Sequence, residues 1–351
     1  MKRDLPKLSL LSFIVLFTFS VKAQDIHLSH IHAAPTYLNP AMVGVFNDGT
    51  TRFIANARSQ WQSVTKGYKT VLGSIDMKIF DTHTSVFSGG LQLYADKAGD
   101  LDFSTTKAAL TFAVSLAFDK RATSFISFGF QTGYTSNRFD QSKMFGFDDE
   151  PLIAYGLVDN IHYFDLSLGA GWFANMGKHN SLYLGAALLH LNMPDVSFSS
   201  RLENEPKSFQ NDEKELFQKI VFHGGGNFRM TKNLTVMPSF IYLDQGPHKE
   251  ISIGSFMKIY EGRSKRKVDK VFYFGAWIRW YKDTGIIGTD AIIASIRTDF
   301  NKTYLTFSFD INLSTLTIAS YGAGGPEISV IQIIDYPRWR KKVFRVDCPV
   351  F

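Results

Sequence analysis

The chain has 351 residues, of which 45% are hydrophobic and 15% aromatic, and it contains one cysteine, Cys348. The apolar content excludes a disordered chain, and a single cysteine excludes an internal disulfide framework and a cluster of thiolate metal ligands. The formal net charge is +6, which would suggest an anionic partner if the charge were spread over the folded part of the chain.

Residues 1–23 are typical of a secretory signal peptide. Lys2, Arg3 and Lys7 precede the apolar run 8–19, and Val21-Lys22-Ala23 places small residues before a cleavage site. No cysteine follows this site, so no lipid anchor is expected. Removing the segment, with its four Lys/Arg residues and one Asp, halves the formal net charge. Nucleic-acid binding thereby loses its main support, and no nucleic-acid partner is expected.

Residues 24–49 precede the first regular pattern and are interpreted as an N-terminal periplasmic or plug segment. His27, His30 and His32 match no structural zinc spacing, so a solvated or lumen-packed segment is expected rather than a metal site. Asn39-Pro40 favours a turn, because proline fixes φ and asparagine tolerates turn conformations. A turn at this point would tuck the segment under or into the structure formed by the strands that follow.

Residues 50–335 alternate with a period of two. Leu305 and Phe307 alternate with Thr306 and Ser308, and the same pattern runs through 107–118. The alternating segments are often eleven residues or longer, and their polar face is rich in Gly, Ser and Thr instead of the Lys and Glu that coat soluble sheets. Alternating segments of about ten residues behind a signal peptide are the signature of an outer-membrane barrel.

The sequence therefore predicts an all-β fold, a transmembrane antiparallel up-and-down β-barrel of about fourteen strands. Trp277, Trp280 and Tyr281 are expected in an interfacial aromatic girdle, because they cluster near a strand end. The predicted strands are 51–63, 69–80, 86–96, 104–118, 123–138, 162–175, 181–191, 219–230, 234–244, 250–260, 271–282, 289–300, 303–314 and 326–335.

The lengths of the connections support this count. The odd-numbered connections include the long segments 139–161 and 192–218, whereas the even-numbered ones are short except for 261–270. Bacterial barrels have short periplasmic turns and long outer loops, so the odd connections are expected outside and both termini in the periplasm. The two long loops are mainly acidic, and the opposite edge is mainly basic.

The basic link 261–270 and the tail 336–351 are interpreted as docking surfaces for acidic periplasmic partners, although a solvated basic tail is an equal alternative. Pro349 cannot donate to a sheet ladder, so the tail is not a simple last strand. The candidate docking residues are Arg263, Lys265, Arg266, Lys267, Arg338, Arg340, Lys341 and Lys342.

Catalysis finds little support in the sequence. Asp76, Asp165 and Asp310 are expected to face the lumen, but no histidine is expected at a matching height on a paired strand. His190 and His223 suit rim or packing roles. No phosphate-binding glycine loop is present, so no enzyme, no catalytic residue, no cofactor and no metal site are expected.

Several short motifs follow one another in a characteristic order. Gln24-Asp25 follow the predicted cleavage site, Tyr37-Leu38-Asn39-Pro40-Ala41 and Gly44 precede the first strand, and Tyr321 to Ser329 lead to Cys348-Pro349. Over the whole mature chain this set resembles the PorP/SprF family, from which 27–32 and the last three residues depart. The matching residues with a presumed structural or plug role are Tyr37, Leu38, Asn39, Pro40, Ala41, Gly44, Arg58, Gln60 and Trp61.

The resemblance implies a non-enzymatic outer-membrane component of the type IX secretion system, which exports surface proteins such as gliding adhesins. Its expected partners are outer-membrane lipid, the periplasmic ring and lipoprotein components of that system, and the secreted cargo. Asn-Pro-Ala near the N-terminus also occurs in fourteen-stranded FadL-like transporters. The alternative is therefore an outer-membrane transporter of small hydrophobic molecules.

Overall fold

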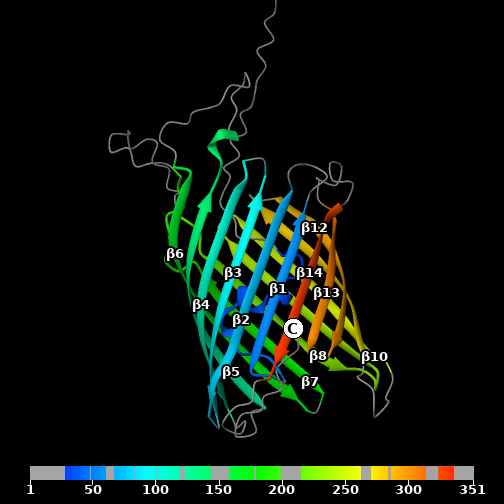
Figure 1. Cartoon of the computed structure of the whole chain (residues 1–351). Coiled ribbons are helices and arrows are strands. Elements are labelled where there is room, and N and C mark those ends of the chain that lie inside the picture. Colours follow the sequence, from blue (N-terminus) through cyan, green and yellow to red (C-terminus); the bar gives the residue numbers. More distant parts are fainter. Residues whose placement is uncertain are drawn as a thin grey trace, which may run out of the picture.

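A computed structural model of the chain shows a closed antiparallel β-barrel of fourteen strands with a helical segment inside it (Figure 1). The predicted signal peptide, the link 262–269 and the tail 336–351 lie outside the described residues. The structure describes residues 28–47, 49–60, 67–82, 84–99, 101–118, 123–143, 158–177, 179–198, 215–261, 270–283, 286–313 and 323–335.

Each strand pairs with its neighbours in sequence, and the barrel closes where β1 pairs with β14, from Thr51 opposite Ile334 to Arg58 opposite Glu327. The strands are β1 (Thr51–Gln60), β2 (Tyr68–Asp81), β3 (Ser85–Ala98), β4 (Phe103–Ala117), β5 (Ser124–Arg138), β6 (Asn160–Met176), β7 (Asn180–Leu189), β8 (Lys219–Arg229), β9 (Leu234–Gln245), β10 (His248–Glu261), β11 (Lys270–Asp283), β12 (Ile286–Phe300), β13 (Thr303–Asn312) and β14 (Ala323–Ile334).

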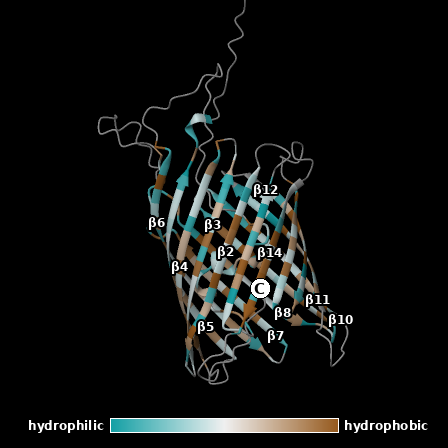
Figure 2. Cartoon of the chain, in the orientation of Figure 1, coloured by the Kyte–Doolittle hydropathy of each residue, from teal (hydrophilic) through white to brown (hydrophobic). Residues whose placement is uncertain are grey.

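The two-residue period of the sequence decides which side chains face outward. On β4, Phe112 is 57% exposed while the preceding Thr111 is 2% exposed. Since successive side chains of a strand point to opposite faces, the apolar set covers the outside and the small or polar set lines the lumen. Figure 2 shows the alternation as hydrophobic residues distributed along every visible strand of the wall. The predicted fold class and strand number are confirmed.

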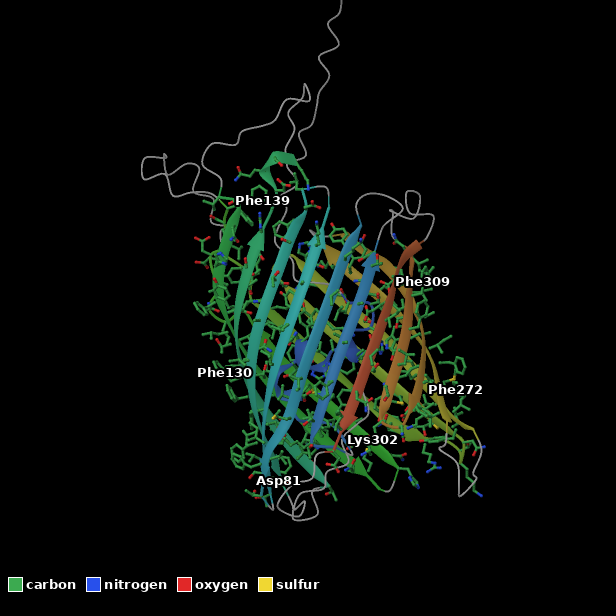
Figure 3. The ribbon with its side chains drawn as sticks, viewed as in Figure 1. Asp81, Phe130, Phe139, Phe272, Lys302 and Phe309 are labelled. Carbon is green, nitrogen blue, oxygen red and sulfur yellow. The ribbon has the colours of Figure 1, made fainter. Side chains whose placement is uncertain are left out.

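The connections divide between the two ends of the barrel as the even strand count requires. Asp81 and Lys302 lie at one end and Phe139 at the other (Figure 3). We call the end with Asp81 and Lys302 the short-turn end, because even-numbered connections such as 301–302 lie there. We call the end with Phe139 the long-loop end. Residues 50 and 335 both lie at the short-turn end, since β1 begins there and β14 ends there.

The girdle prediction is wrong for Trp277. This residue is 3% exposed and points into the lumen, where its ring packs against Phe256 and its Nε1 donates to Ser239 Oγ at 3.1 Å. The physical reason is strand phase: Trp277 shares a face with Tyr273, which is also buried, while Ile278 is 40% exposed. The alternation of side chains along the strand, and not the position of Trp277 near the strand end, decides that Trp277 faces the lumen.

Several strand ends differ from the prediction by one to three residues, and the end of β7 has a local reason. β7 ends at Leu189 because His190 adopts a φ of +58°, a left-handed conformation that turns the chain back toward β6. The chain then folds along the free upper edge of β6: Leu191 N donates to Leu166 O, and the Asn192 amide bonds Leu166 N and Phe164 O. β14 begins at Ala323, earlier than predicted.

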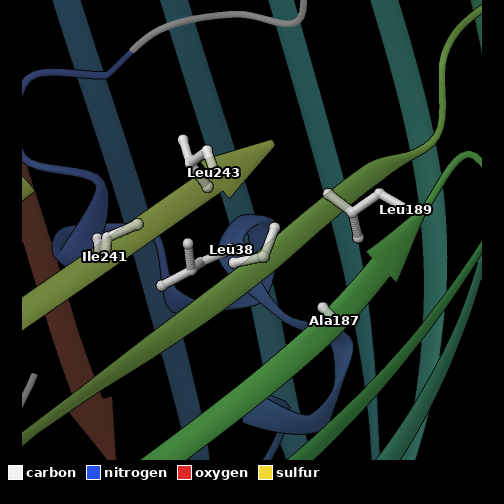
Figure 4. Packing of buried hydrophobic residues seen from close by; sticks show 6 residues of the cluster. Leu38, Ala187, Leu189, Ile241 and Leu243 are labelled. Atoms are coloured by element: carbon white, nitrogen blue, oxygen red, sulfur yellow. The ribbon is translucent and has the colours of Figure 1, made fainter. Parts of the chain in front are cut away.

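The core lies between the wall and the segment inside it. Leu38 of that segment packs on the inner faces of β7, β8 and β9, where it meets Ala187, Leu189, Ile241 and Leu243 (Figure 4). The cluster is apolar although it lines a barrel lumen, because the inserted segment excludes water from it. Among the described residues, no helix has the length and apolar character needed to cross a bilayer.

Candidate functional site: a plug held inside the barrel

Residues 28–46 run through the lumen as three short helical turns, η1 (Ile31–Ala33), α1 (Pro35–Leu38) and η2 (Pro40–Met42). We call this segment the plug. Its first residues bond to Glu327, in the half of β14 nearer the long-loop end, where Ser29 N lies 2.6 Å from Glu327 Oε2. The plug therefore descends toward the short-turn end before the chain enters β1. Of the predicted alternatives, under or inside the barrel, the described part lies inside.

Asn39 anchors the middle of the plug to three strands. It is fully buried, and its Nδ2 lies 3.0 Å from Ala170 O, 3.2 Å from Ala186 O and 3.0 Å from His223 Nε2. Its Oδ1 accepts a hydrogen bond from Ala41 N at 2.8 Å, which caps η2. One amide thus satisfies the start of a helical turn and two wall carbonyls, which is why an amide suits this position better than a hydroxyl or a carboxylate.

The wall is hollowed by glycines where the Asn39-Pro40 turn meets it. A Cβ atom on Gly129 would lie 2.3 Å from Pro40 C, and one on Gly169 would lie 2.0 Å from Asn39 Oδ1. Both approaches are shorter than any real Cβ contact, so these two strand positions need glycine for the plug to fit. Gly44 has a φ of +77°, a backbone conformation that is strained for any residue with a side chain.

Arg52 and Asp76 hold the lower end of the plug. The guanidinium donates to both carboxylate oxygens of Asp76 at 2.9 Å and to the carbonyls of Met42 at 3.0 Å and Val45 at 3.3 Å. Asp76 Oδ2 also accepts from Gly44 N at 2.7 Å. Both charged groups are buried, so the pair is stable only because each remaining donor or acceptor is bonded. The family residue Gly44 is therefore held directly by a buried carboxylate, that of Asp76.

The upper part of the plug is held mainly by ring contacts. The His30 ring lies 4.9 Å from Trp277 and 5.3 Å from Phe256, measured between centroids. Burial lowers the pKa of His30 well below its usual value and that of His32 to about 4, so both imidazoles are neutral at pH 7. The described residues contain no cluster of His, Cys, Asp or Glu that could hold a metal, and His27 lies outside them.

Arg58, another family residue, belongs to a separate charge network near the long-loop end. Its Nη2 lies 2.8 Å from Asp310 Oδ2, and Asp310 also accepts from Arg279 at 3.1 Å. Arg279 donates in turn to Asp290 at 2.6 Å. The network connects β1, β11, β12 and β13, so Arg58 stabilises the wall near its closure. Gln60 ends β1, and Trp61 lies outside the described residues.

The sequence-based expectation that no histidine would reach a lumenal aspartate is wrong. His190 Nδ1 lies 2.9 Å from Asp165 Oδ1, and Lys107 bonds the other oxygen of the same carboxylate. The contact arises because His190 follows β7, which pairs with β6, and the left-handed turn at His190 brings its ring back over the lumen face of β6. His223 has the predicted packing role, beside Asn39.

Six of the nine predicted family residues meet in one place. Tyr37, Leu38, Asn39, Pro40, Ala41 and Gly44 are all in the plug. The predicted docking residues Arg263, Lys265, Arg266, Lys267, Arg338, Arg340, Lys341 and Lys342 lie outside the described residues. Sequence reasoning missed Arg52, Asp76 as its partner, and Gly129 and Gly169; a glycine in the interior of a strand pattern was the available signal for close approach.

The sequence model of the type IX secretion system membrane protein PorP/SprF matches residues 20–331. The chain belongs to the PorP/SprF family. As a closed barrel of this family it is an outer-membrane protein and a member of the type IX secretion system. The match covers the plug, β1 to β13 and most of β14, so the features described above occur within the family region.

Similarity to other known proteins is limited to the fold. A search of curated proteins returns no match. Among solved structures, a mutant of the monoaromatic hydrocarbon channel TodX has 8% identity and a TM-score of 0.45, covering 85% of this chain and 93% of its own. CdiB from Escherichia coli has 9% identity and a TM-score of 0.45, covering 82% of this chain and 63% of its own. These values carry no functional argument.

Proposed function

We propose that this PorP/SprF protein is a non-enzymatic component that supports the secretion or surface attachment of cargo such as adhesins, and that it reaches the outer membrane through the signal peptide 1–23. The observation that carries the proposal is the anchored plug. Asn39 and Arg52 bind it to five strands with buried hydrogen bonds, so the lumen is occupied by the chain itself. A barrel filled in this way offers its two ends, rather than a pore, for interaction.

The long-loop end, which we take as extracellular, carries a network of ion pairs that is suited to binding a protein partner. Lys143 contacts Asp102 and lies 3.2 Å from Asp140, and Lys97 lies 3.1 Å from Asp102. Hydrogen bonds from the two lysines lower the pKa of Asp102 to about 2. These contacts join the β3–β4 tip to the segment after β5 around a cleft of about 660 Å³.

The decisive experiment is deletion of the gene and complementation with the full chain. Surface display of particular adhesins should be lost on deletion and restored by the wild-type chain, while outer-membrane permeability to small dyes stays unchanged. Normal adhesin display in the deletion strain would refute the proposal. Affinity purification from solubilised envelopes should in addition recover periplasmic ring or lipoprotein components of the secretion system.

The same material tests the two rivals. A transporter of small hydrophobic molecules predicts uptake or conductance by the purified barrel in liposomes, and loss of a ligand site when the plug is cut. A hydrolase built on the Asp165–His190 pair predicts hydrolysis that His190→Gln abolishes. In the proposed function Asp165 instead forms an ion pair with Lys107 and a hydrogen bond with His190 inside the wall, and the purified protein is silent in both assays.

A further inference from the structure

A small cavity lies between the plug and the wall beside Tyr37. It is lined by Tyr37, by lumen-facing residues of five consecutive strands, β3 to β7, and by His190 in the turn after β7. Its volume is about 10 Å³, measured for the centre of a water-sized sphere. On this measure a space of about 10–15 Å³ holds one water molecule. We call this space the Tyr37 cavity.

Small residues on the inner face of the wall leave room for the cavity. Ala109 of β4 lines it and is paired with Gly133 of β5, which is paired in turn with Asp165 of β6. A Cβ atom on Gly133 would lie 2.7 Å from Lys107 Cε, which is closer than real Cβ contacts. Glycine therefore lets the lysine cross β5 and reach Asp165, and the space next to Ala109 is closed from the plug side by Tyr37.

Two buried polar side chains of the wall line this cavity. Gln92 is 5% exposed and Ser167 is 1% exposed. Within the described part of the chain, neither side chain hydrogen-bonds another protein group. Buried amides and hydroxyls are nearly always bonded, to protein or to ordered water, because an unmade bond costs their full desolvation. Both groups therefore require a polar ligand in the space that they share.

The charges around the cavity indicate a neutral ligand. Lys107 forms an ion pair with Asp165, and the two side chains are 11% and 1% exposed. His190 Nδ1 lies 2.9 Å from the other oxygen of the same carboxylate. The charge of Lys107 is therefore balanced inside the wall, and the cavity has no unmatched cation to hold an anion. A neutral polar molecule of this volume is water.

We propose that the Tyr37 cavity binds one ordered water molecule, which hydrogen-bonds Gln92 and Ser167 and joins β3 to β6 beneath the plug. A third partner is available, because Gln131 also lines the cavity and only its Nε2 is used, as a donor to Thr111 Oγ1 at 2.8 Å. Buried waters make two to four such bonds. The site is a property of the plugged barrel and holds independently of any role in cargo display.

The bound water would support the plug between its two anchored positions, Ser29 and Asn39. The Tyr37 ring is held beside the cavity by an edge contact with Tyr94 at 6.1 Å and by Lys219 Nζ at 5.7 Å, measured to ring centroids. When the plug opens at Tyr37, the cavity loses its cover and the water exchanges with solvent. Loss of the water should in turn make that opening easier.

The test compares two substitutions of the same shape at Ala109. Valine would displace the water without replacing its hydrogen bonds, which loses stability, whereas threonine places a hydroxyl in the same space. The readout is hydrogen exchange at Tyr37 N, which donates to Ala34 O at 3.0 Å, in the purified full chain. Exchange should be about tenfold faster in Ala109→Val, because two buried polar groups lose their partner, and within about twofold of wild type in Ala109→Thr.

Three results would overturn the proposal. A dry cavity predicts slower exchange in Ala109→Val, because the added methyl groups fill a void. Equal acceleration in the valine and threonine variants would show crowding rather than a lost water. A crystal structure of the full chain should show one peak about 2.7–3.2 Å from polar atoms of Gln92 and Ser167. An anomalous signal at that peak after a bromide soak would identify an anion site instead.

Discussion

The two halves of the plug are held by different kinds of force. Residues 39–46 are fixed by a buried amide, a bidentate ion pair and several backbone acceptors, all with short defined hydrogen bonds. Residues 28–34 are fixed by Glu327, by one hydrogen bond between His32 Nε2 and Ser239 Oγ at 3.2 Å, and by rings that pack without hydrogen bonding each other. The lower half is therefore part of the wall, whereas the upper half is a docked segment whose attachment depends on pH.

The largest expected effect comes from the lower half. Asp76→Asn removes the charge that balances buried Arg52, and breaking such a pair costs about 3–5 kcal/mol. We expect the free energy of unfolding in urea to fall by that amount. Asp244→Asn is the matched control, since Asp244 pairs with Lys249 at 2.6 Å on the surface and should cost at most about 1 kcal/mol. Equal losses in the two variants would contradict the description of the lower half.

A smaller effect is expected at Asn39. Asn39→Ala leaves two wall carbonyls and Ala41 N without their amide partner, which costs about 1–3 kcal/mol. Hydrogen exchange should accelerate in 39–46. Asn192→Ala is the control, because that amide makes two comparable bonds along β6 without touching the plug. If both variants opened the plug equally, the anchor assigned to Asn39 would be wrong.

The upper half should respond to pH. His30 and His32 are neutral when docked, with pKa values below the usual histidine value of 6.5, and accept a proton below that value once released. Docking therefore weakens by about 1.4 kcal/mol per histidine for each pH unit below 6.5, and for His32 the effect levels off near pH 4. Hydrogen exchange, corrected for intrinsic rates, should show that 28–34 opens faster at pH 5.5 than at pH 7.5. A smaller acceleration is expected in 39–46, where one imidazole, that of His223, contacts Asn39. A uniform change through 46 would remove the distinction.

The smallest effect is expected from Glu327→Gln. The amide oxygen still accepts from Ser29 N, but the second carboxyl oxygen is replaced by an amide nitrogen that must find an acceptor of its own, so about 1 kcal/mol is expected. The change should be confined to exchange at Ser29 and His30 and leave Gly44 protected. Slower exchange at these two residues would show that Glu327 does not hold the first turn of the plug.

Much of the fold could be predicted because it depends on local alternation. The two-residue alternation alone predicts that the side chains of Leu305 and Phe307 face outward. The even number of strands places residues 50 and 335 at the same end of the barrel. The family motif Tyr37 to Gly44 also marked the plug correctly. Such features need no knowledge of which distant strands lie opposite each other.

What could not be predicted depends on register or on a single backbone turn. The contact between His190 and Asp165 requires a φ of +58° that no residue pattern announces. The contacts of Arg229, Lys258 and Arg297 with the rings of Tyr260, Tyr273 and Tyr304 join residues from five strands, so they form only once β8 to β13 have paired in register. Trp277 was misplaced because nearness to a strand end was weighed above its place in the alternation.

The bond between Ser29 and Glu327 has a consequence for how the molecule assembles. The two residues are 298 positions apart, and β14, which carries the carboxylate, is also the strand that closes the barrel on β1. The N-terminal half of the plug thus gains the acceptor for Ser29 N only when the last strand is in place. Such long-range contacts slow folding, because the chain loses the entropy of loop closure before the contact can stabilise it. Sealing the wall and seating the plug are therefore steps completed by the same strand.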